Sequence, residues 1–135
     1  MKTLFKNAHI IDPAQGLDGI GELLVEDDRV VAIGSHLQTD LADVEEIDLK
    51  GKLLTPGWID LHSHVFDTVG DFCLPADVVG VQSGVTTVAD AGTSGLLTFS
   101  AFRETVVKPS QTRVYALLDP SLLYIATSDF IAHRL

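Results

Sequence analysis

The sequence predicts an α/β fold in which a small β module precedes a parallel sheet. Residues 1–56 contain short β-like runs separated by turn residues, and no helical period of useful length appears among them. After Pro56 and Gly57 the hydrophobic pattern changes to strand, helix, strand, helix, strand, the order typical of parallel strands joined by crossover helices. We therefore expect two domains, residues 1–56 and residues 57–135.

The β module is predicted from five short runs rich in β-branched and aliphatic residues. The first ends at Asp12-Pro13, where a turn is favoured. Asp27-Asp28 is a tight turn that predicts a hairpin between the second and third runs. The five runs cover residues 4–11, 21–26, 29–34, 45–49 and 52–54.

The second domain is predicted to hold three strands and two complete helices. Pro75 at a first helical position and Gly84 just after the last residue bound one helix, and Pro109 ends the other. Gly92 to Gly95 is expected to be a loop, and Thr127 to Asp129 an N-cap for a further helix. The strands are expected at 58–62, 85–90 and 113–118, and the helices at 75–83 and around 99–108.

Composition excludes several classes of protein. The chain has 135 residues, 46% of them hydrophobic, which is a globular composition. Nine Lys and Arg against 19 Asp and Glu give a net charge of −10, which argues against a nucleic-acid or anionic-membrane surface. A lone Cys73 excludes an intramolecular disulfide, and no apolar run suits a signal peptide or a membrane span. We expect a cytoplasmic protein that acts on a small molecule.

The residues that carry chemistry lie in the first strand of the second domain. Side chains alternate along a strand, so Asp60, His62 and His64 are expected on one face. Two imidazoles at this spacing, near the carboxyl end of a parallel strand, predict two ligands of one metal ion. Asp60 is a candidate to hold an imidazole N–H or to line the site. An isolated H-x-H also occurs by chance, but two imidazoles and a carboxylate on a buried face would be costly without partners.

Other polar residues give weaker signals. Asp90 ends the second strand and is a candidate for substrate or metal-shell contact, with capping of the Gly92–Gly95 loop as the alternative. Cys73 is expected to be a small buried residue rather than a nucleophile. His9, His36 and His133 lack metal-like spacing and are expected to be surface or structural residues.

Two segments also carry a family resemblance. The run from Thr55 to His64 resembles the first-strand signature of the amidohydrolase superfamily of metal-dependent hydrolases, and residues 84–88 resemble the second barrel strand of that family. Within it, the chain is similar to the dihydroorotase-like amidohydrolase and deacetylase group, on residues 64–66, 79–95 and 112–118. The resemblance covers nearly the whole chain.

The resemblance implies the beginning of a (β/α)8 TIM-type barrel, preceded by strands of a small β-sandwich. A complete barrel of this type takes about 250 residues, so the fold is incomplete in this chain. The family implies one or two divalent metal ions, usually zinc, and hydrolysis of an amide or cyclic amide through a metal-bound hydroxide. Only His62 and His64 match the family's metal ligands. A bridging lysine, two further histidines and an aspartate base would come from later strands, and Lys108 in the second helix is not nominated.

Two interpretations therefore remain open. In the first, the chain is the N-terminal part of an amidohydrolase acting on a C–N bond, with deacetylation of a small N-acyl or O-acyl acid among its candidate reactions. In the second, it is a truncated chain that keeps the start of the fold without turnover. No general base or other catalytic residue can be assigned within it. Because three barrel strands would leave an uncovered apolar sheet face, we also expect a homo-oligomer or other association.

Overall fold

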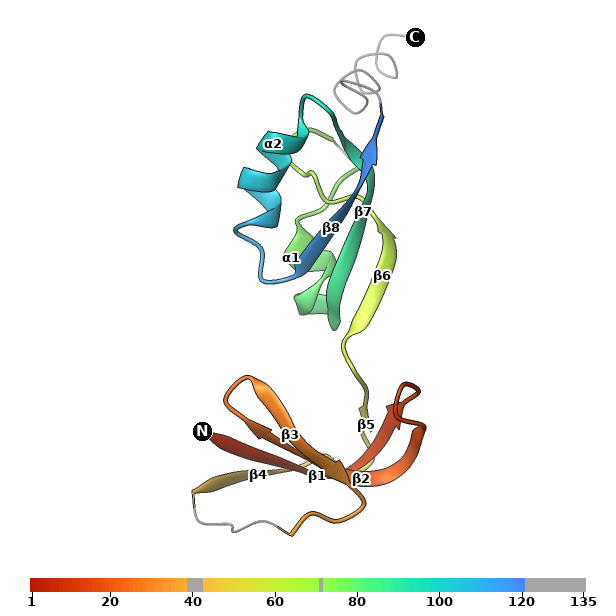
Figure 1. Cartoon of the computed structure of the whole chain (residues 1–135), viewed down its shortest axis with the longest axis vertical. Coiled ribbons are helices and arrows are strands. Elements are labelled where there is room, and N and C mark those ends of the chain that lie inside the picture. The colour runs from red at the N-terminus through yellow and green to blue at the C-terminus, as the bar shows by residue number, and fades with distance from the viewer. Residues whose placement is uncertain (39–42, 71, 121–135) are drawn as a thin grey trace. The chain divides into compact units, whose positions relative to one another are not determined.

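The computed structural model describes residues 1–38, 43–70 and 72–120, and its contacts divide the chain into two compact units (Figure 1). One unit comprises Met1–Pro56, and its described residues form β-strands and turns without a helix; the other comprises Gly57–Leu135 and contains strands and helices. The helix predicted to begin at Thr127 lies outside the described residues.

The first unit is a single five-stranded sheet built around its first strand. β1 pairs antiparallel with β2 and parallel with both β4 and β5, and β2 continues into the predicted hairpin with β3. β2 begins at Leu17, earlier than the pattern indicates, because pairing with β1 stabilises a glycine-containing stretch that has weak strand propensity. The strands are β1 Lys2–Asp12, β2 Leu17–Glu26, β3 Arg29–Gly34, β4 Val44–Asp48 and β5 Leu53–Leu54.

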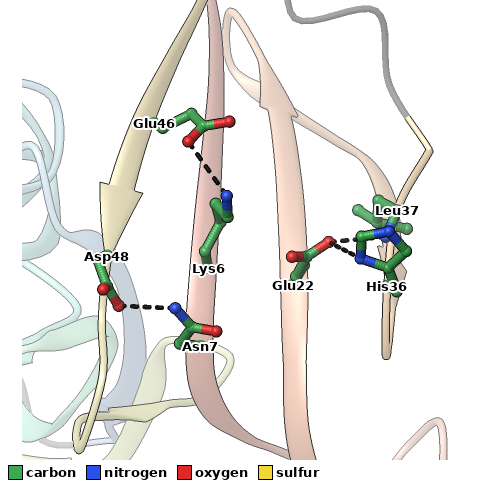
Figure 2. A network of polar contacts seen from close by, with 7 residues as sticks. All are labelled: Lys6, Asn7, Glu22, His36, Leu37, Glu46 and Asp48. Atoms are coloured by element: carbon green, nitrogen blue, oxygen red, sulfur yellow. Dashed lines mark hydrogen bonds and ion pairs between the residues drawn. The ribbon is translucent and has the colours of Figure 1, made fainter.

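Polar side chains on this sheet are paired with one another. The register of β1 against β2 shifts between Phe5 and Ala8, and Asn7 adopts a positive φ of 58° within that bulge. Lys6 and Asn7 then reach β4, where Lys6 Nζ lies 3.2 Å from Glu46 and the Asn7 amide donates to Asp48 at 3.1 Å (Figure 2). The polar groups of this surface are thus satisfied by the sheet itself.

The buried carboxylate of Glu22 anchors the segment that follows β3. It accepts a hydrogen bond of 2.7 Å from the Leu37 N–H and lies 3.5 Å from Nδ1 of His36 (Figure 2). His36 is itself exposed, as the sequence predicts for a histidine without metal-like spacing. Its contact here is structural, because the Glu22 carboxylate that it meets also holds the backbone N–H of the next residue.

The second unit is an α/β layer with three parallel strands in the order β6-β7-β8. The predicted alternation of strands and helices is confirmed, and Figure 1 shows both helical segments on the same side of the sheet. The elements are β6 Trp58–Ser63, α1 Ala76–Val79, a 3₁₀ turn Val81–Ser83, β7 Val85–Gly95, α2 Phe99–Phe102, a π-helical turn Arg103–Val107 and β8 Arg113–Asp119.

Two elements differ from the sequence prediction. The helix expected over 75–83 divides at Gly80, where a Cβ would lie 2.1 Å from Oγ1 of Thr112 and the backbone leaves the helical region. The Gly92–Gly95 segment is strand rather than loop, because Gly95 pairs with Asp119 after an irregular step that places Gly92 at a φ of 82°. Both differences depend on β8 or on the segment that leads into it.

The core of this unit lies between the sheet and its helices. Its fully buried members come from the segment after β6, α1, β7, α2 and the π-helical turn: Val65, Phe66, Ala76, Val88, Phe102 and Val106. The opposite sheet face is open, with Leu61 of β6 and Leu117 of β8 at 73% and 59% exposure. One face of the sheet therefore stabilises the unit, while the other is free to line a site or to be covered.

Candidate metal centre

A bulge at the carboxyl end of β6 sets the directions of the candidate side chains. The register aligns Asp60 with Val88 and Ser63 with Asp90, so β6 advances three residues where β7 advances two. Residues in one row of a sheet point to the same face, and Val88 packs in the core beneath the helices. Asp60 and Ser63 therefore lie on the helix-covered face. The bulge thus interrupts the strict alternation on which the predicted shared face of Asp60, His62 and His64 rested.

His62 and His64 come together at the end of this strand. Their ring centroids are 5.3 Å apart and their planes are nearly perpendicular, at 87°. A zinc ion about 2.0–2.1 Å from a ring nitrogen lies roughly 3.2 Å from that ring's centroid, so two imidazoles of one tetrahedral site have centroids about 5 Å apart. The measured separation matches this arrangement.

His64 also has a buried nitrogen without a hydrogen-bond partner. Its Nδ1 and the Oγ of Ser94 are the two buried side-chain polar atoms left unpaired among the residues that the structure describes. Buried polar groups are nearly always satisfied, so each such atom requires an explanation. A metal ion is a suitable partner for an imidazole nitrogen, and the residues present therefore fit a divalent cation.

The ligand set in the described residues is limited to this pair. Over residues 1–38, 43–70 and 72–120, no group of three or more His, Cys, Asp or Glu side chains is arranged to hold a metal ion. Lys108 pairs with Glu104 at 2.6 Å just after the second helical segment, in keeping with its exclusion as a bridging ligand. His9 pairs with Asp18, and Cys73 is buried. His133 lies outside the described residues.

Asp60 acts on the backbone of the bulge. Its carboxylate accepts hydrogen bonds from the Ser63 hydroxyl and from the His62 N–H, the latter at 2.9 Å. These two bonds, with the Ser63 hydroxyl contributing most, lower the pKa of Asp60 below its usual value. An ionised Asp60 thus fixes the peptide that carries His62, and a smaller Coulombic interaction with His62 lowers the pKa of Asp60 further.

Asp90 holds together the chain segments that follow β6 and β7. Its side chain is fully buried and accepts hydrogen bonds of 3.0 Å from the backbone N–H groups of Val65 and Thr93, together with one from the Thr93 hydroxyl. Asp90 occupies the same row as Ser63, on the helix-covered face. Of the two roles considered for it, the structure shows the capping contact with Thr93 and adds a contact to the residue after His64.

The sequence did not indicate the residues that enclose His64. The Phe72 ring meets the His64 ring edge-on at 5.2 Å, and the Leu74 N–H donates to the His64 carbonyl at 3.1 Å. Both residues lie in an aperiodic stretch with no motif, so no local signal could have identified them.

Comparison with known proteins identifies relatives in two groups of hydrolases, while no protein-family model matches the chain. A deacetylase of Agrobacterium fabrum is 40% identical over 97 residues, which cover 72% of this chain and 24% of that protein. A deacetylase of Brucella anthropi is 40% identical over 103 residues, covering 76% and 25%. A dihydroorotase of Syntrophotalea carbinolica is 45% identical over 67 residues, covering 50% and 15%. The chain thus spans about a quarter or less of these curated relatives.

Solved structures give the same result for the fold. A dihydroorotase matches with a TM-score of 0.74 at 30% identity, over 87% of this chain and 30% of that one. An adenine deaminase matches with a TM-score of 0.71 at 26% identity, over 90% and 31%. Among the described residues, no helix has the length and apolar character needed to cross a membrane.

Proposed function

We propose that this chain, an amidohydrolase-like N-terminal segment, supplies two metal-binding histidines to a hydrolase that cleaves a C–N bond. The observation that carries the proposal is the His62–His64 pair at the carboxyl end of β6, with rings 5.3 Å apart and a buried nitrogen on His64 that has no partner. The names of the relatives support a hydrolase of this kind, because a dihydroorotase hydrolyses a cyclic amide and a deacetylase removes an acetyl group by hydrolysis.

The proposed substrate is a small amide, either a cyclic amide or an N-acylated acid, and deacetylation of an O-acyl acid is the related possibility. A divalent ion, with zinc proposed, would lower the pKa of a bound water towards about 7 and polarise the scissile carbonyl. The chain's own contribution is to orient the ligands. Asp60 fixes the peptide of His62, and Asp90 fixes the peptide that follows His64. Asp60 and Asp90 are therefore proposed as positioning residues.

The fold proposed for the whole protein is a (β/α)8 barrel that begins with β6, β7 and β8. The parallel order of these strands, the helices on one face and the likeness to a dihydroorotase structure support it. The sheet of residues 1–56 would belong to a small β-sandwich. In such barrels the active site lies at the carboxyl ends of the strands, which is where His62 and His64 are located.

A second possibility is that these 135 residues alone bind metal weakly and turn nothing over. It is favoured by the number of ligands, since a catalytic zinc site uses three protein ligands and the described residues supply a pair. The proposal therefore places the remaining ligands on strands later in the longer protein.

Zinc binding and hydrolysis measured side by side test the proposal. On this chain and on the longer protein, zinc is titrated by calorimetry, and activity is assayed with N-acetyl amino acids and cyclic amides. We expect weak binding to the 135 residues, tight binding and turnover in the longer protein, and loss of both on His62→Ala. Tight stoichiometric binding that survives His62→Ala would refute the assignment of this pair.

We also infer that this chain associates, in solution or within the longer protein. The sheet face opposite the helices presents four large apolar side chains, Ile59, Leu61, Tyr115 and Leu117, each more than half exposed. Light scattering on the 135 residues should show oligomers or aggregates. A monodisperse monomer that unfolds cooperatively would contradict this inference.

A further inference from the structure

The loop after β6 closes back onto His64. Val65 and Phe66, which follow His64, are buried in the core, and Val69 N–H donates to the Phe66 carbonyl at 3.1 Å. The chain then returns, and the Leu74 N–H donates to the carbonyl of His64 itself at 3.1 Å. Both the first and the last residues of this loop are therefore fixed.

This closure places one aromatic side chain against the imidazole. The Phe72 ring stands at 83° to the His64 ring, with centroids 5.2 Å apart, which is a favourable edge-to-face arrangement. Phe72 is 52% exposed, although an aromatic ring gains more by complete burial. Phe72 is thus kept against His64 while about half of its surface remains exposed.

The two histidines differ in how firmly they are oriented. His64 is fixed at its ring by Phe72, at its carbonyl by Leu74 and through the next peptide by Asp90. For the exposed His62, the described residues supply the bond from its backbone N–H to Asp60, a Coulombic interaction with the same carboxylate and the ring contact with His64. One ligand is thus preorganised, and the other has more rotational freedom.

We propose that Phe72 is a positioning residue that holds the His64 imidazole in the orientation required for metal binding. The inference rests on the proposed metal site. An unrestrained side chain loses rotamer entropy when it binds, and removing that cost beforehand strengthens binding. The edge-to-face contact supplies this restraint without occupying the His64 nitrogen that lacks a partner.

The test is a Zn²⁺ titration of the 135-residue chain. The NMR signals of the individual histidine rings are the readout, because they resolve weak binding at each histidine. Phe72→Leu keeps the apolar bulk but removes the aromatic ring, whereas Phe72→Tyr keeps an aromatic ring at this position. Phe99→Leu is the matched control, because Phe99 is also partly exposed but its ring contacts Phe102. Phe72→Met is a second variant should Phe72→Leu fold poorly, and thermal melting verifies the fold of each.

We expect Phe72→Leu to weaken zinc binding at the pair by about threefold to tenfold and to change the His64 ring signals in the metal-free chain. Phe72→Tyr should bind as wild type does, and Phe99→Leu should leave both readouts unchanged. If Phe72→Leu binds zinc like wild type while His64→Ala loses binding, the role of Phe72 is refuted and the metal site stands. If the double variant His62→Ala, His64→Ala binds zinc unchanged, the metal site and the role of Phe72 are both refuted.

Discussion

The polar side chains of the two units differ in their hydrogen-bond and ion-pair partners. In the β unit several pair with one another across strands, as Lys6 does with Glu46 and Asn7 with Asp48, although the buried Glu22 also bonds a backbone N–H, that of Leu37. In the α/β unit, buried or half-buried carboxylates such as Asp90 bond backbone N–H groups that shape the ends of the strands. The unpaired polar atoms found among the described residues also lie in the α/β unit. The comparison teaches that satisfied polar groups stabilise this chain, whereas the unsatisfied nitrogen marks the candidate site.

Replacing histidines in the two units should give the largest contrast. If the chain belongs to the metal-dependent hydrolase proposed above, His62→Ala or His64→Ala would remove a ligand from that enzyme, and we expect its activity to fall by about 100-fold or more. His36→Ala in the β unit should change activity little, because His36 is exposed and contacts a structural carboxylate. Steady-state kinetics with bound zinc measured in parallel test this, and equal losses in all three variants would remove the contrast.

Core truncation should destabilise the α/β unit strongly. Phe102 is fully buried and packs against Phe66 with ring centroids 5.1 Å apart. Phe102→Ala should lower the free energy of unfolding of this unit by about 3–5 kcal/mol. Val30→Ala on the β unit, at a position 61% exposed, should change stability by about 0.5 kcal/mol or less. Urea denaturation followed by circular dichroism measures both, and similar midpoints for the two variants would contradict the prediction.

Replacing a glycine by alanine should cost more stability at Gly80 of the α/β unit than at Gly19 of the β unit. A Cβ at Gly80 would lie 2.1 Å from Oγ1 of Thr112 and 2.6 Å from the Ala76 carbonyl oxygen, so Gly80→Ala forces the backbone to shift. We expect a loss of about 1–3 kcal/mol. Gly19 in β2 has nothing within 4 Å of the same position, and Gly19→Ala should be close to neutral. Thermal melting of both variants decides this, and equal melting temperatures would show that the Gly80 turn adapts freely.

Acid should weaken the α/β unit through Asp77. The N–H groups of Thr112 and Gln111 hold the pKa of the Asp77 carboxyl below its usual value. Because the folded pKa is below the unfolded one, this stabilisation is present above about pH 4 and disappears as the pH falls through the folded pKa.

Asp77→Asn should therefore cost about 1 kcal/mol at neutral pH and progressively less in acid. Asp28→Asn, in an exposed turn of the β unit, is the control and should show no such trend. Urea unfolding at pH values from neutral to strongly acidic measures the difference. A cost for Asp77→Asn that is independent of pH would contradict the assigned cause.

Much of the architecture could be predicted because it depends on local patterns. The five β runs of the first unit, the hairpin at Asp27-Asp28 and the parallel order of the second unit follow from turn residues and hydrophobic period. The H-x-H spacing likewise identified His62 and His64, since two residues apart on a strand is a local relation.

Tertiary structure decided the rest, because the partners lie far apart in the sequence. The bulge that places Asp60 in the row of Val88, on the helix-covered face, depends on the register of β6 against β7. Asp90 reaches Val65 across 25 positions, and Gly95 belongs to a strand because Asp119 pairs with it. The Phe72 contact depends on a loop that closes on a hydrogen bond to His64. Sequence alone determined which residues could bind a metal, whereas packing between distant segments determined how firmly each is held.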